Sequence, residues 1–182
     1  MVDSFIPYGR QDISNEDIDS VIKILKSDFL TQGPVVGEFE NAISQAVNAK
    51  YAVAFNSGTS ALHIACLALE LNEDDYLWTT PITFVASANC GLYCGAMVDF
   101  VDINPLTGLM CTNKLKQKLE AAKISGTLPK IVVPVHLAGT SCDMQKIYEL
   151  SQEYGFFIIE DGSHALGGYC DNKSVGSCFY SD

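Results

Sequence analysis

Apolar residues recur at helical spacing in the first fifty residues and then give way to short uninterrupted apolar runs. One apolar stripe predicts an amphipathic helix over residues 14–28, with Ser14 as its cap and Asp17 at the capping-box position. The Gly-Pro pair of "LTQGP" ends this helix, and the same spacing predicts a second helix over residues 36–47. We therefore expect residues 1–34 to form an N-terminal helical arm.

From residue 51 onward, short apolar runs alternate with helical segments. This order implies crossover connections and a mostly parallel sheet, and strands that are apolar on both faces imply helices on both sides. The predicted fold is α/β, a three-layer α/β/α domain over residues 35–182. The predicted strands are Tyr51–Phe55, Tyr76–Thr79, Met97–Val101, Ile131–Val135 and Phe156–Ile159, and the helices between them are Ser60–Leu71, Phe84–Cys94, Asn113–Lys123 and Asp143–Tyr154.

The net charge, the apolar runs and the cysteines disfavour several classes of partner and cellular location. The formal net charge is −11 and the sequence pI is about 4.5, which disfavours nucleic acid and anionic membranes as partners. No apolar run approaches the ~20 residues of a membrane span, and residues 1–10 lack a signal-peptide pattern. Seven cysteines without a Cys-x-x-Cys pair fit reduced thiols in a cytoplasmic protein. Cys90 and Cys94 lie one helical turn apart, but no neighbouring ligand supports a metal site.

Ligands of open parallel sheets bind beyond the carboxyl ends of the strands. In "NSGTS", Gly58 permits a close turn, while Thr59 and Ser60 supply hydroxyls and amides at a helix start. Such a helix start binds phosphate, although an ordinary N-cap has the same composition. In "TTPITFVASAN", Phe84 is placed either to stack on a flat ligand or to pack in the core.

The later loops add carboxylates and histidines. In "FFIIEDGSHALGG" an apolar strand ends at Glu160 and Asp161, with His164 in the next turn. A carboxylate there needs a partner, and catalysis, metal binding and helix capping remain open. His136 of "VVPVHLAG" leaves another strand end and is either structural or in contact with substrate. A phosphate-binding turn, an aromatic ring and a strand-end Asp together favour a pyridoxal phosphate pocket.

At these residues the chain resembles the DegT/DnrJ/StrS sugar aminotransferases. The ordered motifs are "LTQGP", "FNSGTSALH", "TTPITFVASAN", "VDFVDI", "VPVHLAG", "IEDGSHALGG" and "VGS". The resemblance implies the aspartate aminotransferase-like large domain, the cofactor pyridoxal 5'-phosphate and a homodimer. It also implies glutamate as amino donor and a nucleotide-linked keto sugar as acceptor. The motifs are most similar to members that aminate C4 of a UDP-linked 4-keto-6-deoxy-N-acetylhexosamine.

The resemblance also implies roles by position. Gly58, Thr59 and Ser60 would hold the cofactor phosphate, and Phe84 would stack on the pyridine ring. Asp161 would hydrogen-bond the ring nitrogen, and His164 would lie near the phenolic oxygen. No metal is implied.

The family's Schiff-base lysine would follow the "VGS" turn, beyond Asp182. None of the ten lysines occupies that position, and Lys173 is predicted to lie at the surface of a hairpin-like turn. We therefore expect an inactive fragment of a longer enzyme. Alternatives are a sugar dehydratase with His in place of the lysine, a non-catalytic cofactor-binding or interaction fragment, and a nicotinamide-binding domain. The last is disfavoured because no Gly-x-Gly-x-x-Gly follows the first strand.

Overall fold

A computed structural model describes residues 9–182, which form two compact units, residues 9–38 and residues 39–182. In the first unit, helix α1 (Asn15–Leu25) begins at the predicted cap: the Asp17 amide donates to the Ser14 hydroxyl, and the Ser14 amide donates to the Asp17 carboxylate. The capping box is therefore confirmed. Residues 1–8, which belong to the predicted arm and to the segment that lacks a signal-peptide pattern, lie outside the described residues. The limits of the arm remain a prediction.

The second unit contains a parallel four-stranded sheet in the order β2-β1-β3-β4. The strands are β1 (Tyr76–Thr79), β2 (Met97–Phe100), β3 (Ile131–Val132) and β4 (Phe157–Ile158). Pairing continues beyond the two short strands, because Val135 and Asp161 form a further parallel bridge. Four of the five predicted strands are thus present, and their carboxyl ends share one edge.

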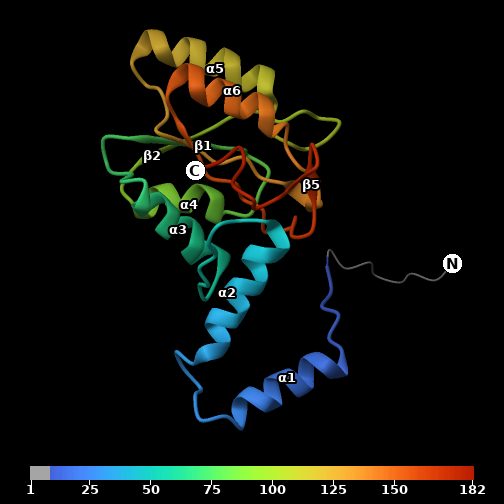
Figure 1. Cartoon of the computed structure of the whole chain (residues 1–182). Helices are drawn as coiled ribbons and strands as arrows, with labels where there is room; N and C mark the ends of the chain where they lie inside the picture. The colour runs from blue at the N-terminus through green and yellow to red at the C-terminus, as the bar shows by residue number, and fades with distance from the viewer. Residues whose placement is uncertain (1–8) are drawn as a thin grey trace, which may run out of the picture. The chain divides into compact units, whose positions relative to one another are not determined.

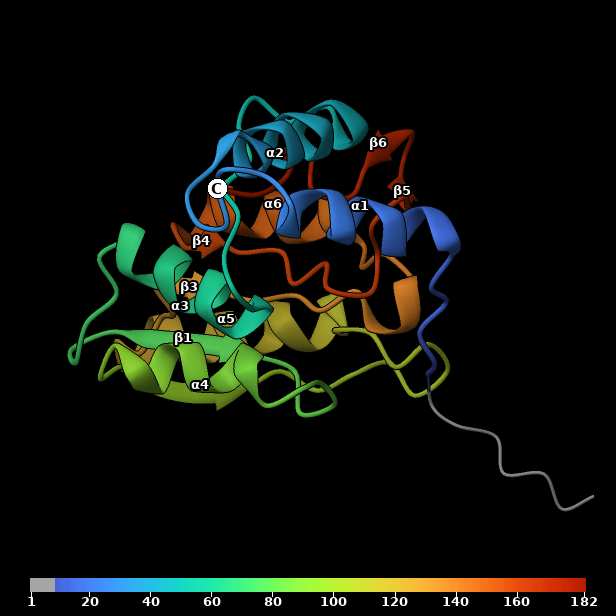
Figure 2. The same cartoon turned by 90° about the horizontal axis from the view of Figure 1, so that it is seen from below.

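Helices cover both faces of this sheet, as Figures 1 and 2 show. On one face, α5 (Thr112–Ser125) and α6 (Met144–Tyr154) pack over a core that includes Trp78, Val132 and Ile158. On the other, α3 (Gly58–Ala68) and α4 (Ala86–Tyr93) cover a core that includes Leu77 and Val133. Neighbouring residues of one strand enter opposite cores, as the side-chain alternation of strands requires. The three-layer α/β/α prediction is confirmed.

The predicted strand Tyr51–Phe55 is wrong. These residues follow α2 (Pro34–Val47) as irregular chain, and Tyr51 and Val53 are exposed. A strand requires a partner for its backbone groups, and no described strand pairs with this segment. The Ala54 amide instead donates to the Glu40 carboxylate at 2.8 Å. An apolar run alone therefore did not determine a strand here.

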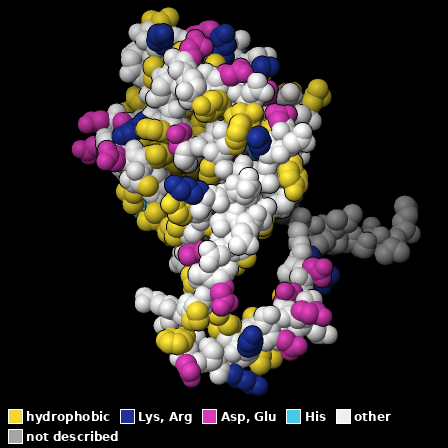
Figure 3. Space-filling view, in the orientation of Figure 1, with side chains coloured by type: hydrophobic (Ala, Val, Ile, Leu, Met, Phe, Trp, Pro, Cys, Tyr) yellow, Lys and Arg dark blue, Asp and Glu magenta, His cyan; other side chains and the backbone are white. Residues whose placement is uncertain are grey.

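A short antiparallel hairpin, β5 (Tyr169–Cys170) and β6 (Lys173–Ser174), follows the last strand of the sheet. Lys173 is exposed there, as predicted. A 3₁₀ turn, Leu137–Gly139, follows the bridge at Val135. On the face drawn in Figure 3, acidic and basic side chains are interspersed among apolar ones. Among the described residues, no helix is both long and apolar enough to cross a membrane.

Candidate functional site

Asp161 lies at the carboxyl edge of the sheet and is buried, with only 6% of its surface exposed. Its amide donates to the Pro134 carbonyl, and its carbonyl accepts from the His136 amide, both at 3.0 Å. These two bonds extend the parallel ladder past β3 and β4 and fix the backbone that carries the carboxylate. The sequence therefore places this acid at the predicted edge on a rigid strand end.

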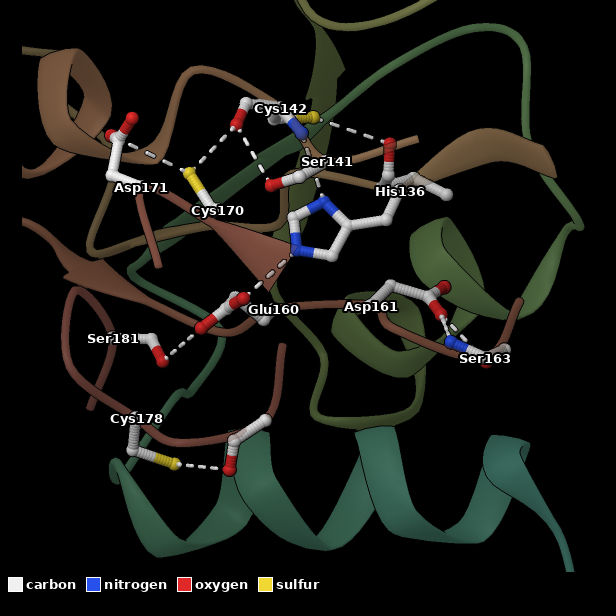
Figure 4. Close-up of polar contacts among 12 residues, drawn as sticks. His136, Ser141, Cys142, Glu160, Asp161, Ser163, Cys170, Asp171, Cys178 and Ser181 are labelled. Carbon is white, nitrogen blue, oxygen red and sulfur yellow. Dashed lines mark hydrogen bonds and ion pairs between the residues drawn. The ribbon is translucent and has the colours of Figure 1, made fainter. Parts of the chain in front are cut away.

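Three donors hold the Asp161 carboxylate. The Ser87 hydroxyl donates to Oδ2 at 2.6 Å. The Ser163 hydroxyl and amide donate to Oδ1 at 2.6 and 3.2 Å (Figure 4). Ser87 belongs to α4 and Ser163 to the turn after Asp161, so two separate segments form hydrogen bonds to the same side chain. Hydrogen bonds to the ionised form offset the free-energy cost of removing a carboxylate from water.

The amino end of α3 lies beside this carboxylate turn. A Cβ placed on Gly58 would be 3.6 Å from the Ser163 hydroxyl oxygen. Ser57 caps the helix, and its hydroxyl accepts from the Ser60 amide at 3.1 Å. The Gly58 and Thr59 amides precede the first intrahelical donor and point out of the helix end, where an anion is stabilised. The predicted phosphate turn and the predicted Asp are therefore neighbours.

Phe84 stands one helical turn before Ser87 and is 72% exposed. A large aromatic ring with so much exposed surface is not a core residue, so the packing alternative raised by the sequence does not apply. The Phe84 carbonyl lies 3.3 Å from the Ser87 hydroxyl, which links the exposed ring to the helix that holds Asp161. Phe84 thus presents an exposed ring one helical turn before Ser87, the residue that bonds to the carboxylate.

His136 lies on the other side of the strand end. Its ring is fully buried, Nε2 is 2.8 Å from Glu160 Oε2, and Nδ1 accepts from the Cys142 amide at 3.1 Å. Glu160 also accepts from the Ser181 hydroxyl at 2.7 Å (Figure 4). In this geometry neither ring nitrogen faces a ligand. Glu160 and Asp161 are consecutive in an extended chain, so their side chains point to opposite sides.

Two ionisable groups of this second cluster have shifted pKa values. Burial acts to raise the pKa of Glu160, but the hydrogen bonds from His136 and Ser181 outweigh it, and this pKa lies below its ordinary value. Burial raises the pKa of the Cys142 thiol to about 12. The Cys142 thiol donates to the Val135 carbonyl at 3.3 Å. A protonated thiol and an ionised carboxylate therefore flank the buried imidazole.

His164 is exposed in the turn after Asp161. Its carbonyl oxygen would lie 3.1 Å from a Cβ on Gly139, so this turn touches the loop after His136. Gly139 has a φ of 85°, a conformation that glycine adopts without strain. Among the described residues, no group of three or more His, Cys, Asp or Glu side chains is arranged to hold a metal ion.

The sequence patterns assigned no role to Ser87, Ser163 or Glu160, although all three belong to these two clusters. Ser163 could have been found from its position two residues after Asp161, where a hydroxyl readily bonds back to a carboxylate. The bond between Ser87 and Asp161 joins residues 74 positions apart, and no local pattern predicts it. The structure brings Gly58, Phe84 and Asp161 together around one edge.

The fold and this edge define an α/β domain of the aminotransferase type. The sequence profile of the DegT/DnrJ/EryC1/StrS aminotransferase family matches residues 11–179, and the chain belongs to this family. A UDP-4-amino-4,6-dideoxy-N-acetyl-beta-L-altrosamine transaminase from Campylobacter jejuni is 42% identical over 172 residues, which are 94% of this chain and 44% of the relative. The chain thus spans less than half the length of such curated relatives.

Solved structures agree with this assignment. PseC from Helicobacter pylori, an aminotransferase involved in the biosynthesis of pseudoaminic acid, superposes with a TM-score of 0.81 at 33% identity, over 93% of this chain and 44% of its own. The PLP form of Spr1654 from Streptococcus pneumoniae superposes with a TM-score of 0.82 at 27% identity, over 94% and 46%. The expected family and fold are therefore confirmed.

The described residues fit pyridoxal phosphate. A phosphate requires N–H donors, which the start of α3 offers; a protonated ring nitrogen requires an ionised acceptor, and Asp161 is surrounded by donors alone. A flat ring requires an uncovered apolar surface, which Phe84 provides. These three features lie along the same sheet edge.

Proposed function

We propose that residues 39–182 bind pyridoxal phosphate for a sugar aminotransferase. The observation that carries this proposal is the buried Asp161 carboxylate, gripped by Ser87 and Ser163 next to the start of α3. In this proposal, Gly58, Thr59 and Ser60 bind the phosphate. Phe84 covers one face of the ring, and His164 lies near the phenolic oxygen.

When bound, the cofactor supplies an electron-accepting ring that stabilises negative charge on the reacting carbon. Asp161 keeps a proton on the ring nitrogen, because an ionised carboxylate with only donors around it favours a cationic partner. The sequence left His136 open between a structural role and contact with substrate. Because both of its nitrogens are already bonded, we propose that it positions Asp161 through the bond from its amide to the Asp161 carbonyl.

The reaction proposed for the longer protein transfers an amino group from glutamate to a nucleotide-linked keto sugar. The name of the Campylobacter jejuni relative, a transaminase of a UDP-linked amino sugar, supports a UDP-linked substrate. The family resemblance also supports a homodimer, and seven cysteines without a disulfide among the described residues support a cytoplasmic location.

We further propose that the lysine that carries the cofactor is not one of the ten in these 182 residues. The ammonium groups of four of these lysines interact with side chains other than Asp161. Lys118 pairs with Asp99, Lys130 with Asp75, and Lys146 with Asp143, while the Lys173 ammonium lies 4.1 Å from the centre of the Phe179 ring. Binding of the cofactor by this chain would then be reversible and would not lead to turnover.

Titration of the 182-residue chain with pyridoxal phosphate, followed by cofactor absorbance and by quenching of the single tryptophan, tests the site. We expect saturable binding that Asp161→Ala weakens at least about tenfold, the loss of one charge-assisted bond. Asp171→Ala, in the β5–β6 turn, is the matched control and should bind like the wild type. Dimerisation without any cofactor signal would overturn the proposal and favour an interaction fragment.

A further inference from the structure

The Asp161 carboxylate can accept only a limited number of hydrogen bonds. An ionised carboxylate offers about four lone-pair positions, two on each oxygen. Ser163 fills both positions on Oδ1 through its hydroxyl and its amide, and Ser87 fills one on Oδ2. One position remains, and it belongs to Oδ2. If the proposed cofactor binds here, Oδ2 is therefore the atom that accepts from the ring nitrogen.

The direction of donation is defined for the two hydroxyl groups, of Ser87 and Thr83, that form a chain of hydrogen bonds to Asp161 Oδ2. Ser87 has a single hydroxyl proton and two acceptors within reach, Asp161 Oδ2 at 2.6 Å and the Phe84 carbonyl at 3.3 Å. The shorter bond to the ionised oxygen is the stronger one. Thr83 Oγ1 lies 2.8 Å from Ser87 Oγ. Since Ser87 donates its proton to Asp161, Thr83 must be the donor to Ser87.

We infer that Ser87, supported by Thr83, is a positioning residue that aims the open lone pair of Asp161 Oδ2 at the ring nitrogen of the cofactor. This inference rests on the proposed function. Ser87 is fully buried on α4, while Asp161 and Ser163 lie on the strand end and its turn. Ser163 bonds to Oδ1 only, so without Ser87 no described side chain holds Oδ2 in place. The bond from α4 provides that hold.

The test compares two probes that differ only at the ring nitrogen: pyridoxal phosphate and 1-deazapyridoxal phosphate, in which CH replaces the nitrogen. Their affinities for the 182-residue chain are measured by tryptophan quenching in the wild type and in Ser87→Ala. The ratio of the two affinities isolates the contact with the ring nitrogen. We expect Ser87→Ala to reduce this ratio about fivefold, which corresponds to about 1 kcal/mol.

Ser151→Ala is the matched control. Ser151 is also buried on a helix and also donates to the carbonyl three residues earlier, but it has no carboxylate partner in the described structure. Its ratio should equal that of the wild type. Thr83→Val keeps the Ser87 bond and removes only the donor behind it, so its ratio should fall by a smaller factor, about twofold.

The outcomes separate the two proposals. If the wild type binds neither probe, or binds both equally, the proposed cofactor site is wrong and this inference falls with it. If the wild type prefers pyridoxal phosphate and Ser87→Ala retains the full preference, the cofactor site stands and the inference is wrong. A fall of the ratio in Ser87→Ala and Thr83→Val, with Ser151→Ala unchanged, supports the inference.

Discussion

The imidazole of His136 donates from Nε2 to Glu160 Oε2 at 2.8 Å, and this bond joins the loops after β3 and β4 beneath the candidate site. The proton must be on Nε2, because Nδ1 accepts from the Cys142 amide. The ring is therefore neutral and uses both nitrogens internally. The same loops carry Asp161, so the cluster of His136, Glu160 and Cys142 fixes the backbone that carries the Asp161 carboxylate.

Replacement of His136 by Phe should destabilise the domain strongly. The variant leaves the Cys142 amide without its acceptor, and it leaves the Glu160 carboxylate with the Ser181 hydroxyl but without the imidazole donor. We expect a loss of about 3 kcal/mol in the free energy of unfolding, the usual range for breaking a buried polar pair. Urea denaturation followed by circular dichroism measures it.

His63→Phe is the control for this substitution. The His63 ring packs edge-on against Tyr93 with 5.3 Å between the ring centres, a contact that a Phe ring can also make. This variant should stay within about 0.5 kcal/mol of the wild type, as for most substitutions that break no buried bond. Equal losses in the two variants would show that the His136 cluster contributes nothing specific.

Glu160 should make the stability depend on pH in the acid range. Its pKa is lowered in the folded state, so its contribution is fully present above the unfolded-state pKa of about 4.3 and is lost as the pH falls through the folded-state value. The urea midpoint of the wild type should therefore drop between about pH 5 and pH 3. In Glu160→Gln this part of the drop should be missing.

Glu149→Gln serves as the matched variant for the pH profile. Glu149 is exposed on α6 and bonds only to Gln145 among the described residues. Its profile should follow that of the wild type. If the urea midpoint falls equally steeply at acid pH in Glu160→Gln and in the wild type, the His136 and Ser181 bonds do not have the role assigned to them.

Local sequence patterns were sufficient for the layers of the fold but not for every element. β1 was predicted to the residue because Tyr76–Thr79 is a short apolar run between two predicted helices, and it finds strand partners on both sides in β2 and β3. Tyr51–Phe55 has the same apolar character, yet it is irregular because strand formation depends on a partner elsewhere in the chain. Pairing is a tertiary property, and a run of residues does not encode it alone.

In the candidate site, too, some features follow from local sequence patterns and others depend on tertiary packing. The positions of Gly58 and Asp161 at the sheet edge follow from where the strands end, so the sequence predicts them. The hydrogen bond from Ser87 to Asp161 depends on how α4 packs against β1 and β2, and the burial of His136 depends on the fold of its own loop. Patterns therefore located the groups that would face the cofactor, and only coordinates located the groups that hold them.

A side chain at Gly139 should destabilise the loop after His136. Gly139 has a φ of 85°, and a Cβ there would lie 3.1 Å from the His164 carbonyl oxygen. Gly126 ends α5 with a φ of 75°, and its Cβ would meet nothing within 4 Å. Both Ala variants incur the cost of a left-handed conformation, about 1 kcal/mol. Only Gly139→Ala adds a clash with backbone, so its loss of unfolding free energy should be about 2 kcal/mol or more.

The comparison of these two variants by urea denaturation separates backbone strain from crowding. Because the crowded atom belongs to His164, Gly139→Ala should also weaken pyridoxal phosphate binding, while Gly126→Ala, at the far end of α5, should leave binding unchanged. If the two variants lose the same stability and bind the cofactor alike, the contact between the loop after His136 and the turn after Asp161 does not shape the site.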